Sequence, residues 1–375
     1  MRLYVIALFC LQLPTIPTQA QWDLEDSRTT ANLRGIVNVG GGVAWASGTN
    51  GTVLRTEDGG YLWRTCTTPS GGEHLDFRGI QAFDASTAIV MSSGRGDLSR
   101  LYKTTDGCQT WKLLFTNPDK DGFWDALYFD HDHQSGWILG DPVKRQFTIF
   151  SSDNAGRTWM RQRNAGLKAR AEGQGAFAAS NSSVCESNGG IEFGTGGSEG
   201  AYLYLTTDTE IVLSDPSSGA TKFEHQIGWE RNEVPVGNHS ESSGVFSLAK
   251  RWNLMTIPPR EVKIAIGGDY LRPDDSAANA AWTDDRGKTW HVSQTAPHGF
   301  RSAVAYDADS KTWIAVGPNG TDVSSDDGRN WRALHPNAAL HDAPDADRNW
   351  NALSLPFVVG PGGRIGKLRD HALKP

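Results

Sequence analysis

A recurring eight-residue motif constrains the fold of this chain more than any other feature. Its fullest copy, at residues 283–290, follows the pattern Ser/Thr-x-Asp-x-Gly-x-Thr-Trp, and looser copies lie at residues 56–63, 104–111, 152–159 and 324–331. In such a segment the Asp carboxylate accepts hydrogen bonds from backbone N–H groups of its own turn. The Gly takes a positive φ, and the Trp buries a large apolar face at the start of the next strand. The five copies therefore predict a repeated hairpin turn whose carboxylates are structural.

The motif resembles the Asp-box of the BNR-type β-propellers, and its spacing fits repeated blades. Trp63, Trp111 and Trp159 are 48 residues apart, and Trp290 and Trp331 are 41 apart. Self-similarity at such periods is the signature of a repeat architecture. The interval from Trp159 to Trp290 is 131 residues, and we expect it to hold three repeat lengths with two degenerate boxes.

Seven segments share the pattern of an inner propeller strand, an apolar stretch followed by a second strand that ends in Gly. These inner strands are predicted at residues 34–36, 78–80, 124–126, 176–178, 245–247, 301–303 and 351–353. The second strands are predicted to end at Gly48, Gly94, Gly140, Gly194, Gly267, Gly317 and Gly360. The fold class predicted is all-β, a seven-bladed β-propeller of four-stranded antiparallel blades.

The two ends of the chain predict how the ring closes. The last repeat stops near Leu368 without a following box Trp, whereas residues 22–25 precede the first inner strand at the distance seen after other box Trp residues. We expect the N-terminal segment to supply the outer strand of the seventh blade. Closure of this kind removes an open sheet edge.

Residues 1–20 have the features of a signal peptide, and residues 21–375 are predicted to form a single propeller domain. Arg2 precedes an apolar run at residues 3–13, and small residues precede Gln21. The run is too short for a membrane span, so we expect an exported protein, periplasmic or extracellular. Three cysteines follow this segment, and at least one of them is therefore free or pairs with another molecule.

Composition narrows the range of partners. The formal net charge of −7 argues against nucleic acid as a partner. The sequence contains no phosphate loop, dinucleotide fingerprint, haem motif or zinc-ligand spacing, so no cofactor and no metal are expected. The chain is predicted to act as a monomer.

The propeller pattern places the variable connections on one face, called here the top face. This face carries the starts of the inner strands and the turns between second and third strands, and the box turns lie on the opposite face. The connections that vary most are residues 93–98, 141–146, 195–200 and 268–276, with longer ones at 168–174, 225–243 and 335–348. Variable loops on a rigid scaffold usually carry binding functions.

A more specific resemblance covers almost the whole chain after residue 20. Residues 33–36, residues 45–51 and the box at 56–63 resemble the photosystem II stability/assembly factor family and its bacterial relatives. That resemblance implies a binding role, with an arginine-rich patch that holds a protein client. The residues predicted to bind on this basis are Arg34, Arg78 and Arg301, which start equivalent inner strands, and their top-face neighbours Trp124, Asp125 and Asp322.

A second resemblance points to enzymes. Sialidases also combine Asp-boxes with a propeller, and three arginines around a channel are similar to their carboxylate clamp. The candidate catalytic residues would be Glu172, Asp269, Tyr270 and Asp141, because glycoside hydrolysis needs paired carboxyl groups or a Tyr–Glu pair. The Arg-Ile-Pro signature of sialidases is absent, and six blades rather than seven are usual there. The function predicted is therefore a binding or assembly factor for a protein client or a glycan, and the alternative is a glycoside hydrolase.

Overall fold

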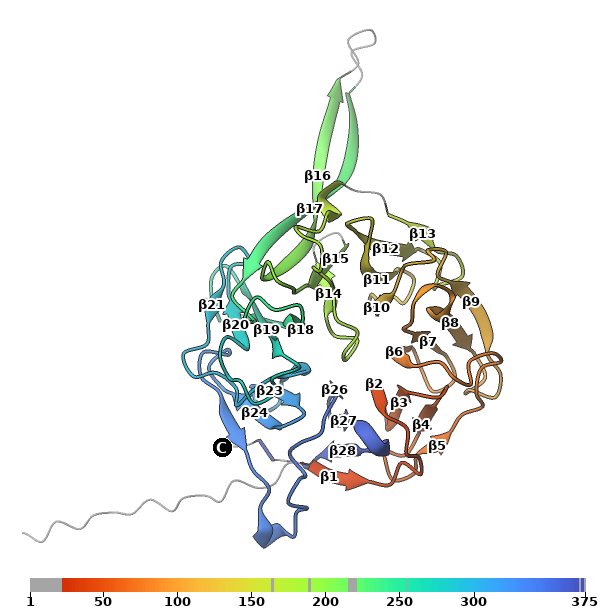
Figure 1. The fold of residues 1–375 in the computed structure, drawn as a ribbon, viewed down its shortest axis with the longest axis vertical. Helices are drawn as coiled ribbons and strands as arrows, with labels where there is room; N and C mark the ends of the chain where they lie inside the picture. The colour runs from red at the N-terminus through yellow and green to blue at the C-terminus, as the bar shows by residue number, and fades with distance from the viewer. Residues whose placement is uncertain are drawn as a thin grey trace, which may run out of the picture.

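The protein is a ring of seven four-stranded antiparallel sheets (Figure 1). The computed structural model describes residues 22–162, 165–187, 190–214, 221–253, 255–370 and 372–373, with only the backbone considered at 208–214 and 221–227. Inner strands β2, β6, β10, β14, β18 and β26 lie towards the middle of the ring in Figure 1. The predicted seven-bladed propeller is confirmed.

The blades follow one another in chain order. Blade one contains β2 (Leu33–Gly40), β3 (Val43–Gly48), β4 (Val53–Thr56) and β5 (Arg64–Thr65); blade two contains β6 (Phe77–Ala82), β7 (Ala88–Ser92), β8 (Arg100–Thr104) and β9 (Lys112–Thr116). Blade three contains β10 (Trp124–Phe129), β11 (Gly136–Val143), β12 (Gln146–Ser152) and β13 (Met160–Arg161); blade four contains β14 (Val184–Ser187), β15 (Gly190–Gly194), β16 (Ala201–Ser214) and β17 (Thr221–Val234). Blade five contains β18 (Ser243–Asn253), β19 (Arg260–Asp269), β20 (Ala280–Thr283) and β21 (His291–Val292); blade six contains β22 (Ala303–Asp307), β23 (Thr312–Gly317), β24 (Gly320–Ser324) and β25 (Arg332–Leu334). Blade seven contains β26 (Ala352–Ser354), β27 (Phe357–Val359), β28 (Ile365–Leu368) and β1 (Trp22–Glu25). Short 3₁₀ turns lie at η1 (Gly96–Leu98), η2 (Ala165–Leu167), η3 (Ala338–Leu340) and η4 (Pro361–Gly363).

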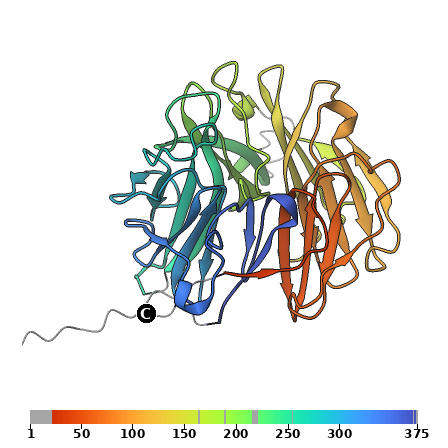
Figure 2. The same ribbon diagram turned by 60° about the horizontal axis from the view of Figure 1, so that its bottom comes forward.

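The N-terminal strand closes the ring as predicted. Strand β1 pairs antiparallel with β28, from Trp22 opposite Leu368 to Glu25 opposite Ile365. Figure 2 brings this seam forward, with red β1 beside dark blue β28. The Trp22 side chain is 2% exposed, and its Nε1 donates a hydrogen bond of 3.1 Å to Thr321 Oγ1 in blade six. The first strand therefore fastens the last two blades together.

The repeated turns have the hydrogen bonds expected of them. In the fullest copy, the Asp285 carboxylate accepts bonds from the backbone N–H groups of Lys288 and Thr289, each at 3.0 Å through Oδ1. In the second copy, hydrogen bonds from the side chain and backbone of Thr110, together with Thr104, lower the pKa of Asp106 to about 2. These carboxylates therefore stay ionised and hold the turns.

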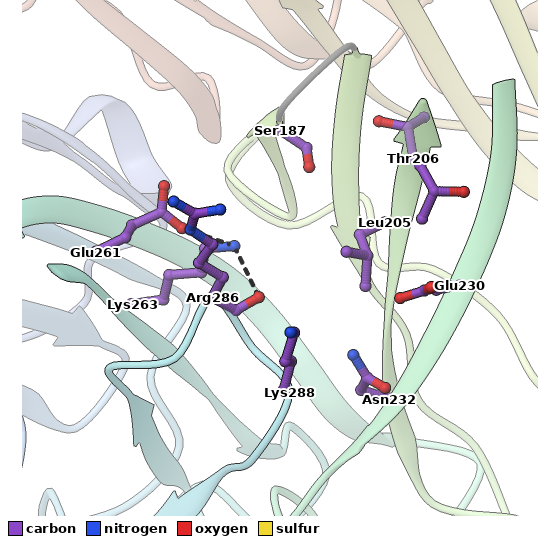
Figure 3. Close-up of a pocket in the computed structure, with 10 residues that line it drawn as sticks. Ser187, Leu205, Thr206, Glu230, Asn232, Glu261, Lys263, Arg286 and Lys288 are labelled. Atoms are coloured by element: carbon purple, nitrogen blue, oxygen red, sulfur yellow. Dashed lines mark hydrogen bonds and ion pairs between the residues drawn. The ribbon is translucent and has the colours of Figure 1, made fainter. Parts of the chain in front are cut away.

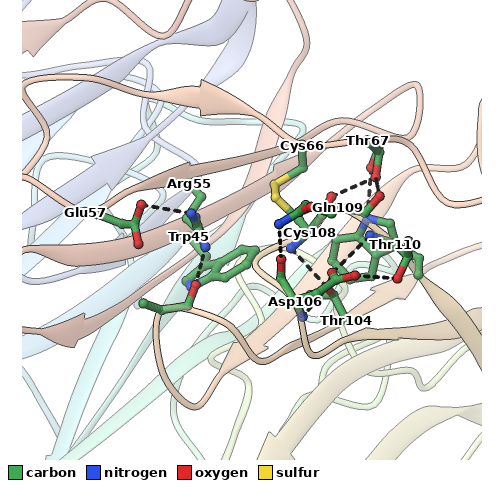
Figure 4. The surroundings of a disulfide bond; sticks show 12 residues. Trp45, Arg55, Glu57, Cys66, Thr67, Thr104, Asp106, Cys108, Gln109 and Thr110 are labelled. Carbon is green, nitrogen blue, oxygen red and sulfur yellow. Dashed lines mark hydrogen bonds and ion pairs between the residues drawn. A yellow bond between two sulfur atoms is a disulfide. The ribbon is translucent and has the colours of Figure 1, made fainter.

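A disulfide joins the first two blades at one of these turns. Cys108 occupies the Gly position of the motif in blade two, with φ +66°, and bonds to Cys66 just after β5 of blade one. Figure 4 shows the bond beside the Asp106 turn, where Thr67 Oγ1 also donates 2.7 Å to the Cys108 carbonyl. Among the described cysteines, Cys185 has a free thiol.

Blade four departs from the sequence prediction. The interval between Trp159 and Trp290 holds blade four and most of blade five, not three repeats, because blade four has no box turn. Instead β16 and β17 pair over 14 residues, from Ala201 opposite Val234 to Ser214 opposite Thr221. This pair projects away from the ring as a long ribbon at the top of Figure 1. Much of the predicted 225–243 connection is therefore strand.

The inner strand of blade four also starts later than predicted. Residues 176–178 precede β14 and form no strand, and the segment they begin extends into the middle of the ring. Ser180 Oγ donates 2.8 Å to the Ser302 carbonyl of blade six, and Asn181 Oδ1 accepts 2.7 Å from Leu127 N of blade three. The segment 176–182, called here the plug segment, therefore bridges blades across the central channel.

Apolar side chains pack between neighbouring blades and hold the ring rigid. Between blades three and four, for example, Ile149, Phe147 and Phe193 are 0 to 2% exposed and belong to one cluster. Burial of each such side chain contributes about 1.5–3 kcal/mol. In the described part of the chain, no helix is long and apolar enough to cross a bilayer.

Candidate binding cavity

A cavity of ≈ 440 Å³ lies at the centre of the top face. Side chains from blades one, two, three, five, six and seven and from the plug segment line it. They include five of the residues predicted from the sequence: Arg34, Arg78, Asp125, Asp141 and Tyr270. Because the plug segment crosses the channel and contributes Ala176, Phe177 and Ala178 to the lining, it forms the floor of this cavity.

A β-bulge at the start of the inner strand aims the key side chains into the cavity. In blade one the pairing of β2 with β3 passes from Leu33–Gly48 to Gly35–Ser47 and leaves Arg34 unpaired. The same shift leaves Arg78 unpaired in blade two, Asp125 in blade three and Phe246 in blade five. Bulges redirect a side chain in this way at functional sites. Four blades thus present one residue each at an equivalent position.

Arg34 and Arg78 form the positive side of the cavity and share a single carboxylate. Arg78 Nε donates 2.8 Å to Asp76 Oδ2, and its Nη1 donates 3.1 Å to the Ala178 carbonyl. Arg34 Nε lies 3.8 Å from Asp76 Oδ1, too far for a hydrogen bond. Burial lowers the pKa of Arg34, and the charge of Arg78 lowers it further, against an opposite effect of Asp76. The two guanidinium groups share one ion-pair partner, and Arg34 Nε has no hydrogen-bond partner among the described residues, so this side offers N–H donors to an anion.

Asp125 and Asp141 form a buried acidic pair beside the arginines. Asp125 is 2% exposed, and its Oδ2 has no hydrogen-bond partner, whereas Asp141 Oδ1 accepts 3.0 Å from Ala176 N of the plug segment. Burial raises the pKa of Asp125 well above its usual value, and the neighbouring Asp141 adds to the effect. Burial also raises the pKa of Asp141, to about 6. Because two adjacent buried carboxylates resist double ionisation, the pair holds a proton in mildly acidic solution.

Aromatic rings form an apolar wall of the cavity. Phe177 of the plug segment stacks on Phe246 with centroids 3.9 Å apart, and Phe300 meets Phe246 edge-on at 4.7 Å. Tyr270 contacts the same ring at 6.0 Å and is 49% exposed. The cavity therefore joins a charged side to an apolar side, as binding sites for peptides and small molecules do.

Three predicted binding residues lie outside the cavity. For two of them, the predicted starts of the inner strands are matched one residue out of step. Arg301 N donates to the Gly267 carbonyl of the preceding blade, as Leu33 N does to Gly360, so Arg301 is equivalent to Leu33 rather than to Arg34. Trp124, which pairs with Gly140, occupies the same position. Both side chains are 0% exposed. The prediction that Arg301 joins an arginine cluster is therefore wrong, and Ser302 lines the cavity in its place.

The third residue, Asp322, is the buried partner of Arg301. Both side chains are 0% exposed, and Arg301 Nε donates 2.7 Å to Asp322 Oδ2. His298 Nδ1 lies 2.6 Å from the other carboxylate oxygen. The group fixes top-face turns of blades five and six.

Two predicted catalytic residues also lie outside the cavity lining. Burial opposes ionisation of Asp269, but hydrogen bonds from Ser242 (2.6 Å) and Arg272 (3.0 Å) and other donors outweigh it and lower its pKa. Asp269 therefore organises the 238–243 and 268–276 loops. Glu172 is exposed on the connection before the plug segment and is not among the residues that line the cavity.

Phe177, Phe246 and Asp76 were missed in the sequence, although each had a signal. Phe177 and Phe246 lie in segments predicted to be inner strands, where an aromatic residue suggests a buried core side chain rather than a binding residue. Asp76 precedes Arg78 by two residues, a spacing that allows a local ion pair. In the described part of the chain, no group of three or more His, Cys, Asp or Glu gathers in a way that could hold a metal ion.

Comparisons with known proteins agree with this fold. No family model matches the chain, and no curated protein matches it. Among solved structures, YCF48 bound to D1 peptide is 17% identical with a TM-score of 0.57, over 92% of this chain and 96% of that one. YCF48 from Cyanidioschyzon merolae is 17% identical with the same TM-score, over 94% and 100%. The extracellular domain of the putative hybrid two-component system BT4673 from B. thetaiotaomicron is 12% identical with a TM-score of 0.54, over 93% and 39%. The chain is thus a seven-bladed propeller that resembles the YCF48 structures in fold over nearly its whole length.

Proposed function

We propose that the protein binds an extended segment of a client protein in the central cavity of the top face. Arg34 would hold an acidic side chain of the client, and the Phe177–Phe246 wall would take a neighbouring apolar side chain. The observation that carries the proposal is the pair of arginines with one shared carboxylate beside an aromatic wall. The fold similarity to a YCF48 structure bound to a D1 peptide supports a protein client.

The proposal includes an exported location, periplasmic or extracellular, as the features of residues 1–20 indicate. Those residues lie outside the described part of the chain. A client in that compartment would be a secreted protein or an exposed segment of a membrane protein. The protein would act as an assembly factor that holds the segment without changing it.

Short synthetic peptides test the charge requirement directly. Peptides with Asp or Glu next to Phe or Leu are compared with versions that carry Asn or Gln instead, by fluorescence anisotropy. We expect the acidic peptides to bind more tightly, and Arg34→Gln to weaken them by about tenfold or more, since a charge-assisted hydrogen bond is worth roughly 1.5–3 kcal/mol. Arg95→Gln is the matched control, because Arg95 is 74% exposed on a top-face loop outside the cavity. Equal binding of acidic and amide peptides, or an inert Arg34→Gln, would refute the proposal.

A glycoside hydrolase remains the second candidate because of the Asp125–Asp141 pair. A carboxyl group with a raised pKa can act as a general acid, and a second carboxylate can serve as base or nucleophile. Hydrolysis of a glycan panel that is lost in Asp141→Asn would favour this reading. Peptide binding without any glycan turnover would leave the client-binding proposal standing alone.

A further inference from the structure

A second cleft lies between blades four and five, and it shares no lining residue with the central cavity (Figure 3). Its volume is ≈ 370 Å³. One wall is the box turn of blade five with strand β19, and the other is the base of the β16–β17 ribbon with the end of β14. Since box turns lie opposite the top face, the cleft opens on the other side of the molecule.

The turn wall carries two cations that form no ion pair with another described residue. Arg286 and Lys288 are exposed in the 283–290 turn, and neither side chain has an ion pair or hydrogen bond among the described residues. Behind them, Lys263 is 4% exposed and pairs with both Glu192 and Glu261, and Glu261 also lies 3.9 Å from Lys250. Lys263 Nζ also contacts the Arg286 carbonyl at 3.5 Å, which anchors the turn. The two free cations are therefore held on a rigid support.

The ribbon wall carries uncharged hydrogen-bonding groups and one carboxylate. Glu230 and Asn232 lie on β17, and in Figure 3 both face the gap from the side opposite Arg286. Glu230 is exposed and has no ion pair within the described part of the chain. Thr207 adds a hydroxyl, and Leu205 adds a small apolar surface. Unmatched charges of opposite sign thus face each other across the cleft.

This arrangement complements a sugar that carries a carboxylate. Arg286 and Lys288 would bind the carboxylate, while Glu230 and Asn232 would bind ring hydroxyls, with Leu205 against a C–H face. An inorganic anion would leave Glu230 unmatched, and a neutral sugar would leave the two cations unmatched. We infer that the cleft is a binding site for an acidic saccharide, a short oligosaccharide that contains uronic acid.

Isothermal titration calorimetry with matched oligosaccharides tests this inference. The probes are galacturonate and glucuronate oligomers, the corresponding neutral galactose and glucose oligomers, and inorganic phosphate. We expect the uronate oligomers to bind at least about tenfold more tightly than the neutral ones, because charge-assisted bonds are roughly twice as strong as neutral ones. The double variant Arg286→Asn with Lys288→Gln should lose this preference. Asn is chosen at position 286 because it tolerates the φ of +67° there.

Two further variants distinguish the contacts to the hydroxyls from those to the carboxylate and provide a control outside the cleft. Glu230→Gln should weaken the neutral oligomers because it acts on their hydroxyls. It should weaken the uronate oligomers by a smaller factor, because it also removes a negative charge that repels their carboxylate. Arg157→Ala, at the same position of the blade-three turn as Lys288, should leave binding unchanged. The inference is overturned if neutral oligomers bind equally, if phosphate displaces the uronates as well as they displace one another, or if the double variant binds like the wild type. Absence of uronate binding up to about 10 mM would overturn it too.

Discussion

At the residue scale, two adjacent carboxyl groups give the central cavity a dependence on pH. Asp125 and Asp141 come from neighbouring strands of blade three, and both are buried beside Arg78. Burial raises both pKa values, so protons bind more tightly to the folded protein than to the unfolded chain. A carboxyl group whose pKa is higher in the folded state stabilises the fold at low pH. This stabilisation is lost as the pH rises from the pKa of the unfolded chain to the pKa of the folded protein.

Asp141→Asn should remove much of this dependence. The pKa of Asp141 is raised from 3.8 to about 6, so the advantage of the variant in unfolding free energy over the wild type should grow between pH 4 and pH 7. A shift of this size corresponds to about 3 kcal/mol at most. Urea unfolding at the two pH values measures the difference, with Asp97→Asn, an exposed top-face carboxyl, as the control. A difference between wild type and variant that stays constant with pH would contradict the assignment.

At the element scale, the repeated turn is both the part most readable from sequence and the source of the main errors. The five copies of the motif correctly located the turns of five blades. Blade four has no such turn, and its long ribbon was interpreted as extra repeats and a loop. The arginine cluster failed at Arg301 because a bulge is a property of pairing, which no single segment reveals. Arg34, Arg78 and Asp125 line the cavity because each stands at the bulge itself. The plug segment could not be foreseen because its bonds cross the ring.

The disulfide between Cys66 and Cys108 is a covalent link between blades one and two. Replacement of Cys66 by Ser and Cys108 by Gly removes the cross-link and restores the Gly that other copies of the turn carry at the positive φ. The loop it closes spans 42 residues, so we expect the variant to lose up to about 4 kcal/mol of unfolding free energy. Thermal unfolding with and without reductant is the measurement. Reductant should lower the Tm of the wild type and leave the variant unchanged; an insensitive wild type would disprove the contribution.

At the scale of the whole molecule, stability depends on how the ring is shut. Strand β1 contributes the outer strand of blade seven, and Trp22 reaches blade six through Thr321. The rest of the ring is joined by packing between blades that follow one another in the chain. The seam is the one place where the two ends of the sequence must meet.

Trp22→Ala should therefore destabilise the whole ring rather than one blade. Loss of a fully buried Trp costs about 3–5 kcal/mol, and a chain that begins after Thr30 should lose more because β28 is then an open edge. Trp252→Ala is the control, since this Trp is 47% exposed and should change stability by less than about 0.5 kcal/mol. Denaturant unfolding compares the three. If the truncated chain unfolds at the wild-type midpoint, β1 does not close the ring.

The pairing of β1 with β28 also determines the order in which the blades can be completed during synthesis. Among the strands of the ring, β1 comes first in the chain and its partner, β28, comes last. Each earlier blade can form as soon as its own four strands exist, but β1 has to wait through the synthesis of all of them. Until then β1 has no partner strand. Anything that delays the synthesis of blade seven would prolong the period in which a chaperone could hold β1.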